Sequence, residues 1–178
     1  KQGTVVYMCG EGYRGVLARL KAIMLHDQVD TLGNLYLTNR ITDFSSADDI
    51  KATVKELNDA GIKPDFVIID TLARASGGLD ENSTSDMNKF VKACDFMRKK
   101  LNGASILPVH HTGKGDKTVA RGSSVLRAAM DVEIMVEPVE GGITVASTKA
   151  KDGEPFETLG FSFARVNFGQ QDEDGEEL

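Results

Sequence analysis

Three apolar runs of the sequence end in side chains that can do chemistry. Glu11 follows the run TVVYMCG. Asp70 is the last residue of DFVIID, and Thr71 comes directly after it. His110 and His111 follow the run SILPV. A carboxylate can hold Mg²⁺ or accept a proton from an attacking water, and an imidazole can contact a phosphate oxygen. Because the carboxyl ends of parallel strands meet at one edge of a sheet, we expect these groups to share one crevice.

The run FVIID has the form of a Walker B strand, an apolar strand that ends in an aspartate. In that form the carboxylate of Asp70 holds Mg²⁺, usually through water, beside the phosphates of a nucleotide. Glu11 lies between two glycines and suits a general base that orients the attacking water. The plainer interpretations are that Asp70 caps the next loop and that Glu11 is a surface residue in a turn.

His110 and His111 are adjacent on an extended run, so their side chains point to opposite faces. Neither an HExxH pattern nor a cysteine cluster accompanies them, which argues against a metal centre. We therefore expect at least one histidine to face the crevice and to report the loss of a γ-phosphate.

The loop after the histidines, residues 112–121, contains the cations Lys114, Lys117 and Arg121 together with two glycines. Clustered cations of this kind bind phosphate backbones, so we expect the loop to contact a nucleic acid. The alternative is a loop that is merely solvated.

Short β-branched runs alternate with apolar residues at helical spacing, which predicts strands and helices in turn. Strands are expected near residues 4–9, 35–37, 65–70 and 105–109, and helices near 16–24, 46–61, 90–101 and 123–130. Ser46 and Asp49 form a variant capping box at the start of the second helix.

More regularly alternating strands follow at 132–137, 143–150 and 158–166, separated by the turn-forming pairs Gly141-Gly142 and Asp152-Gly153. The whole pattern predicts an α/β domain, with a mostly parallel sheet flanked by helices and an antiparallel C-terminal extension.

Composition fits one soluble domain. The 178 residues include 40% apolar and 27% charged residues, and the apolar runs are too short to span a membrane. The net charge is −6, and five of the acids lie in the tail QQDEDGEEL, so the global charge says little against a nucleic-acid partner.

We expect residues 1–168 to form the domain and residues 169–178 to be a disordered acidic tail. Two distant cysteines favour a reducing, cytoplasmic setting.

Four blocks carry a family resemblance: VVYMCGEGYRGVLARLKA, FVIIDTLAR, LPVHHTGKGDKTVARGSSVLRAAMD and STKAKDG. They are similar to successive motifs of RecA-like P-loop ATPases, and most similar to the RepA- and DnaB-type hexameric replicative helicases of plasmids and phages. The resemblance runs from about Val5 to Phe163. It implies a RecA-like fold, ATP and Mg²⁺ as cofactors, single-stranded DNA as partner, and a homo-oligomeric, hexameric ring.

The resemblance also implies roles for single residues. Glu11 matches the catalytic glutamate, Asp70 the Walker B aspartate with Thr71 beside it, and His110 or His111 the phosphate sensor. Lys114, Lys117 and Arg121 lie in the loop that faces the central channel and touches DNA in such proteins. Arg121 or Arg127, and Lys149 or Lys151, match basic positions that reach the nucleotide of a neighbouring subunit.

One departure from the family pattern is large: the sequence contains no GxxxxGK[ST] loop. Its first strand resembles the strand that follows the phosphate-loop helix, so we expect that loop either to precede Lys1 in a longer chain or to have been lost. Without its lysine and its backbone N–H groups, tight ATP binding by these residues alone is not expected.

Three other functions stay open at this point. A degenerate RecA-like module could assemble or hold DNA without hydrolysis. A metal-dependent hydrolase could use Asp70, His110 and His111. A receiver-like signalling domain with Asp70 as phosphoacceptor ranks lower, because Glu11 stands alone where an acidic pair is expected.

Overall fold

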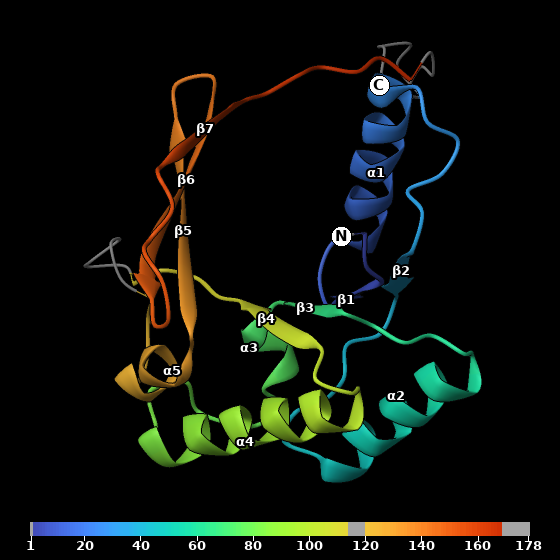
Figure 1. Cartoon of the computed structure of the whole chain (residues 1–178). Helices are drawn as coiled ribbons and strands as arrows, with labels where there is room; N and C mark the ends of the chain where they lie inside the picture. Colours follow the sequence, from blue (N-terminus) through green and yellow to red (C-terminus); the bar gives the residue numbers. More distant parts are fainter. Residues whose placement is uncertain (1, 114–119, 169–178) are drawn as a thin grey trace. The chain divides into compact units, whose positions relative to one another are not determined.

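The computed structural model describes residues 2–113 and 120–168, which belong to two compact units (Figure 1). The first unit comprises Lys1–Arg14 and Leu32–Ala129, and the second comprises Gly15–Thr31 and Met130–Leu178. Over the described residues, no helix is both long and apolar enough to cross a membrane.

The first unit is built on a four-stranded sheet in the order β2-β1-β3-β4. Its strands are β1 (Val5–Cys9), β2 (Leu35–Thr38), β3 (Phe66–Asp70) and β4 (Ser105–Val109). All three neighbouring pairs are parallel. The central position of β3 fits its apolar run FVII, since Val67 and Ile69 are completely buried on one face and Phe66 and Ile68 are half-buried on the other.

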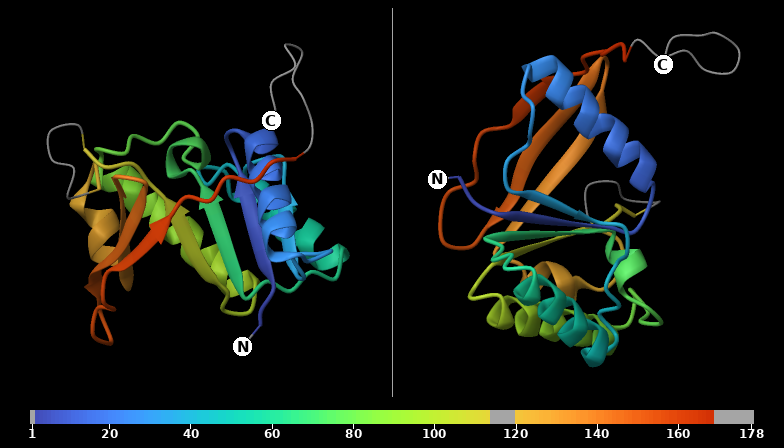
Figure 2. Two further views of the ribbon diagram at one scale, coloured as in Figure 1. Left: turned by 90° about the horizontal axis from the view of Figure 1, so that it is seen from above. Right: turned by 90° about the vertical axis from the view of Figure 1, so that its right-hand side faces the viewer.

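One face of this sheet carries the core of the unit. Val6, Met8, Val67 and Ile69 are completely buried there. The helices α2 (Ala47–Asp59) and α4 (Thr84–Lys100) lie side by side over that face (Figure 2). Both helices face inward with apolar residues at helical spacing, which are Ile50, Val54 and Leu57 in α2 and Met87, Phe90, Cys94 and Met97 in α4.

The two covering helices begin with the same hydrogen-bonded turn, at DFSSADD and DENSTSD. The N-cap Ser46 accepts the Asp49 N–H at 3.2 Å, and Asp49 in turn accepts the N–H of Asp43 at 2.6 Å. The expected capping box at α2 is thus confirmed at its serine, while the aspartate bonds three residues further back than a standard box does.

The second copy of this turn, at the start of α4, was not expected from the sequence. Ser83 accepts the Asp86 N–H at 3.3 Å, and Asp86 accepts the Asp80 N–H at 3.2 Å. The turn fixes where α4 begins and therefore where residues 80–83 lie.

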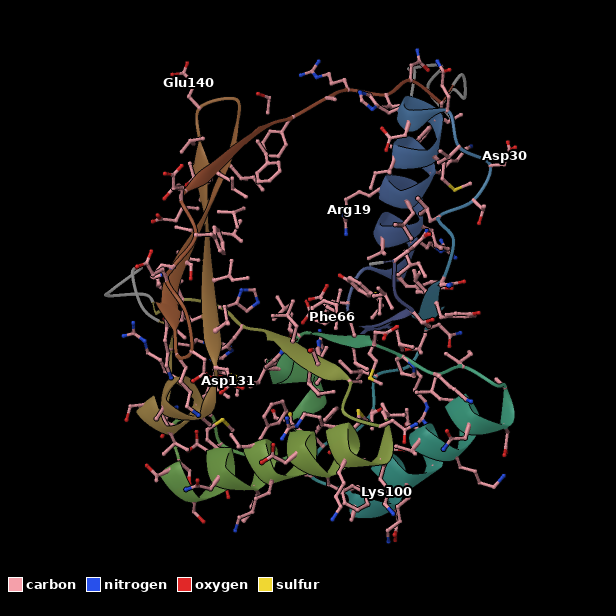
Figure 3. All side chains as sticks on the ribbon, viewed as in Figure 1. Arg19, Asp30, Phe66, Lys100, Asp131 and Glu140 are labelled. Carbon is pink, nitrogen blue, oxygen red and sulfur yellow. The ribbon has the colours of Figure 1, made fainter. Side chains whose placement is uncertain are left out.

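The second unit contains α1 (Tyr13–Asp27) from Gly15 onward and an antiparallel sheet of β5 (Val132–Val139), β6 (Gly142–Ala150) and β7 (Leu159–Ser162). Asp131 lies at the start of the β5–β6 hairpin and Glu140 at its tip (Figure 3). The apolar stripe expected on α1 buries only Val16.

The predicted fold class is confirmed, because a parallel sheet flanked by helices is followed by an antiparallel sheet. Three details of the prediction were wrong. A short helix, α3 (Leu72–Ala75), follows β3 at residues where no helix was predicted. In addition, α4 begins at Thr84 rather than near residue 90, and β7 is shorter than the run at 158–166. The predicted helix at 123–130 is α5 (Ser124–Ala129). The acidic tail and the cations Lys114 and Lys117 lie outside the described residues.

Candidate functional site

The strand register brings three of the predicted chemical groups to one edge of the parallel sheet. Cys9 pairs with Asp70, and Asp70 pairs with Val109. Glu11 follows two residues after Cys9, and His110 directly follows Val109. The carboxyl ends of β1, β3 and β4 therefore lie level with one another, which is the edge where open α/β sheets bind ligands.

Gly10 lets the chain leave β1 close to β3. Its N–H donates to the Asp70 carbonyl at 2.6 Å. A Cβ at this position would lie 2.8 Å from the Arg74 Cβ and 2.9 Å from the Asp70 carbonyl oxygen, closer than side-chain atoms approach. Glycine is thus required here, and it delivers Glu11 to the side of the sheet edge where α3 begins.

Glu11 pairs with Arg74 of α3. The Arg74 Nε donates to the Glu11 Oε1 at 2.8 Å, and both side chains are largely exposed. Arg74 lies four residues after Asp70, so one turn of helix after β3 carries a cation back toward the end of β1. The candidate base is therefore held in place by a neighbouring cation.

Asp70 ends β3 half-buried, and the hydroxyl of Tyr7 in β1 donates to its Oδ2. Within the part of the chain that the structure describes, its Oδ1 has no protein partner. Thr71 is 5% exposed, joined to Asp70 by a cis peptide bond, and forms the N-cap of α3. Its Oγ1 is buried without a hydrogen-bond partner among the described residues.

These oxygens fit a magnesium ion with its water shell. Mg²⁺ is commonly held by one or two carboxylates, several waters and the phosphates of a nucleotide, so a half-buried aspartate with one open oxygen is a suitable ligand. The unpaired hydroxyl of Thr71 is a second polar atom that a water or a ligand could satisfy. Across residues 2–113 and 120–168, no three His, Cys, Asp or Glu side chains group closely enough to hold a metal ion by themselves.

The ring of His110 is directed at the base of the basic loop. Its Nε2 lies 2.9 Å from the Arg121 carbonyl oxygen, and since a carbonyl only accepts, Nε2 carries the hydrogen. Its Nδ1 is buried without a partner among the described residues. The carbonyl of His111 accepts the Arg121 N–H at 3.2 Å, and Thr112 forms a bridge with Ala120. The two histidines thus close the loop at its base, and the side chain of His111 is exposed.

A second set of contacts ties the loop base to the turn before α4. The Arg121 Nε lies 2.8 Å from the Glu81 Oε1, an ion pair without hydrogen-bond alignment, and the Ser123 N–H donates to the Glu81 carbonyl at 2.8 Å. Gly122 has φ +88°, and a Cβ there would collide with the same carbonyl. Arg121 is therefore engaged within its own chain.

The remaining predicted site residues lie on elements other than the strands of the parallel sheet. Arg127 lies in α5. Lys149 lies in β6 opposite Glu133, and Lys151 directly follows β6 and pairs with Asp131 at 3.4 Å. Both lysines belong to the second unit.

Comparison with known families places this sheet in context. Residues 1–117, which are 117 of the 178 residues, match the family model of the AAA domain. The chain belongs to the AAA domain family. This family is a class of P-loop ATPases that also occurs in RecA-like helicases, and such domains bind a nucleotide with Mg²⁺ in general. A search of curated proteins gave no match.

Three residues that contact the candidate site residues were not predicted from the sequence: Tyr7, Arg74 and Glu81. Tyr7 carried a usable signal, because a polar-tipped aromatic in an otherwise apolar strand usually finds a hydrogen-bond partner. Arg74 lies one helical turn beyond the end of β3, but α3 was not predicted. Glu81 lies in a polar loop, where no sequence pattern distinguishes it from its neighbours.

Proposed function

We propose that this AAA domain is the RecA-like ATPase core of a DNA helicase, or of a related replication or recombination factor. In this proposal it couples ATP hydrolysis to the binding of single-stranded DNA, as the RepA- and DnaB-type resemblance implies. The observation that carries the proposal is the register Cys9–Asp70–Val109, since it aligns Glu11, Asp70 and His110 at the ligand-binding edge of the sheet.

Each group at this edge has a distinct task. Asp70, with Thr71 beside it, would hold Mg²⁺ through water, and the bound ion would offset charge that develops on the transferring phosphoryl group. Glu11 orients and deprotonates the attacking water. The Glu11 side chain is exposed in this chain, so the domain by itself shields the attacking water from bulk solvent only in part.

His110 links the nucleotide to the DNA loop. Its ring contacts the Arg121 carbonyl, so a change in its position at the sheet edge moves the base of the loop that carries Lys114 and Lys117. Arg127, Lys149 and Lys151 act on the nucleotide of a neighbouring subunit in a homo-hexameric ring. These basic groups stabilise charge in the transition state.

ATP hydrolysis by a longer form of the chain, one that carries a GxxxxGK[ST] loop, tests the proposal. Single-stranded DNA should stimulate hydrolysis, and Asp70→Asn should remove it. Asp48→Asn, at an exposed position of α2, is the matched control and should change nothing. Hydrolysis that is indifferent to both DNA and Asp70 would refute the proposal.

A non-hydrolysing binding module is the second candidate, and it is the function that these 178 residues could perform without a GxxxxGK[ST] loop. Such a module would bind single-stranded DNA with the same loop while Asp70→Asn had no effect. No observation favours the metal-dependent hydrolase, because Asp70, His110 and His111 do not group as metal ligands.

A further inference from the structure

Tyr7 stands beside Asp70 because of the strand register. Tyr7 pairs with Ile68 and Cys9 pairs with Asp70, so Tyr7 and Asp70 are offset by two residues on neighbouring parallel strands. Side chains two residues apart share a face of a sheet. The alternate residues Val6 and Met8 are completely buried on the opposite face, so Tyr7 and Asp70 share the half-buried face.

The contact between them is directional. The phenol O–H of Tyr7 donates to Oδ2 of Asp70, a bond to an ionised acceptor, which is stronger than one between neutral groups. A phenylalanine would fill the same space on the strand but would leave both carboxylate oxygens to rotate. Tyr7 therefore fixes one oxygen and leaves Oδ1 as the ligand atom.

We propose that Tyr7 is a positioning residue for Asp70, which orients the carboxylate toward the site of Mg²⁺. The inference rests on the metal-holding role of Asp70 in the proposed function. Groups that hydrogen-bond a metal ligand fix its orientation, and their loss typically weakens metal binding by about 10- to 100-fold.

Manganese binding to the 178-residue chain tests this role without any need for hydrolysis. Mn²⁺ broadens the amide NMR signals of nearby residues, so Gly10 and Thr71 report the sheet edge separately from the acidic tail. Tyr7→Phe should raise the Mn²⁺ concentration for half-broadening of these two signals by about tenfold or more. Tyr36→Phe, on β2, removes a hydroxyl from an exposed tyrosine and should leave that concentration unchanged.

Asp70→Asn separates the two possible failures. If Asp70→Asn leaves the broadening at Gly10 and Thr71 unchanged, Asp70 holds no metal, and the proposed function and the role of Tyr7 both fail. If Asp70→Asn removes the broadening while Tyr7→Phe behaves like Tyr36→Phe, only the role of Tyr7 is overturned.

A second measurement leaves Tyr7 in place and therefore does not depend on how well Tyr7→Phe folds. The chain has three tyrosines, so labelling with 3-fluorotyrosine gives three ¹⁹F signals. Tyr13→Phe and Tyr36→Phe assign two of them, and the third belongs to Tyr7. Asp70→Asn should shift the Tyr7 signal and leave the other two in place. An unmoved Tyr7 signal would overturn the proposal.

Discussion

The Nε of Arg74 lies 2.8 Å from the Oε1 of Glu11, although the two residues follow different strands of the sheet. Glu11 follows β1, whereas Arg74 is carried by the helix that follows β3. This ion pair joins the candidate base to the element next to the candidate metal ligand. Because both side chains are exposed, the pair contributes only about 0.2–1 kcal/mol to the stability of the fold. We therefore expect the loss of this ion pair to change the rate of hydrolysis more than the stability of the fold.

Glu11→Gln should abolish ATP hydrolysis by a longer chain with a phosphate loop and should leave ATP binding intact. The change removes a base and no phosphate contact, and it alters the free energy of unfolding by less than about 1 kcal/mol. Arg74→Ala should lower hydrolysis less, because Glu11 remains but is no longer held. Glu140→Gln, at the tip of the hairpin, is the control (Figure 3). Equal hydrolysis by the Glu11 and Glu140 variants would exclude Glu11 as the base.

The basic loop should contact single-stranded DNA through Lys114 and Lys117. Each lost phosphate contact should reduce the salt slope of binding by roughly 0.7, since fewer counterions are released. We therefore expect a double substitution to alanine to weaken binding and to lower the slope by roughly twice that amount. Lys99→Ala with Lys100→Ala, at the end of α4, provides a pair of lysines away from the loop. The loop makes no direct contact if affinity and slope match this control.

The fold class followed from the sequence because its signals are local. FVII and SILPV are apolar at nearly every position, and such short runs, which alternate with apolar residues at helical spacing, favour strands of a layered α/β fold. The sheet edge also followed, since parallel topology brings Glu11, Asp70 and His110 together once the strands are recognised.

The partners of these residues did not follow from the sequence, because they depend on register and on a turn of helix. Tyr7 meets Asp70 only because β1 and β3 pair at Cys9 and Asp70. Arg74 meets Glu11 only because α3 follows β3 directly. Arg121 meets Glu81 only because of where the Glu81 side chain lies, which no periodicity of the sequence predicts.

Lys149 and Lys151 should act across a subunit boundary. Their replacement by alanine should lower turnover by ~10³-fold or more, on the scale of an arginine finger, while stability changes within about 0.5 kcal/mol. The decisive experiment mixes a variant without Glu11 and a variant without both lysines, each inactive alone. Mixed junctions that regain a base and a basic pair should restore hydrolysis. If mixed oligomers form and remain inactive, the lysines act within their own subunit or not at all.

Cys94 should make the protein less stable in alkali. Burial, and to a lesser extent the charge of Asp95, raises the pKa of its thiol to about 12. The folded state therefore keeps a proton that the unfolded state loses, so the stabilisation is complete below about pH 8.5, the ordinary pKa of a thiol, and falls as pH rises toward the folded pKa. The slope is about 1.4 kcal/mol per pH unit between these values.

Urea unfolding of the wild type and of Cys94→Ala at several pH values measures this slope. We expect the variant to be less stable at neutral pH, because it leaves a cavity beside α4, and to lose less stability between pH 9 and 11. Cys9→Ala is the matched control. Parallel curves for the wild type and Cys94→Ala would contradict the assignment.

The central claim is that a nucleotide binds at the sheet edge formed by Glu11, Asp70 and His110. Its most direct test is an NMR titration of the 178-residue chain with Mg²⁺ and ATP, because the amide shifts report position and affinity together. The account predicts binding in the millimolar range, since no phosphate loop is present, with the largest shifts at residues 10–12, 70–72 and 110–111. Shifts that spare these residues, or micromolar binding, would contradict it.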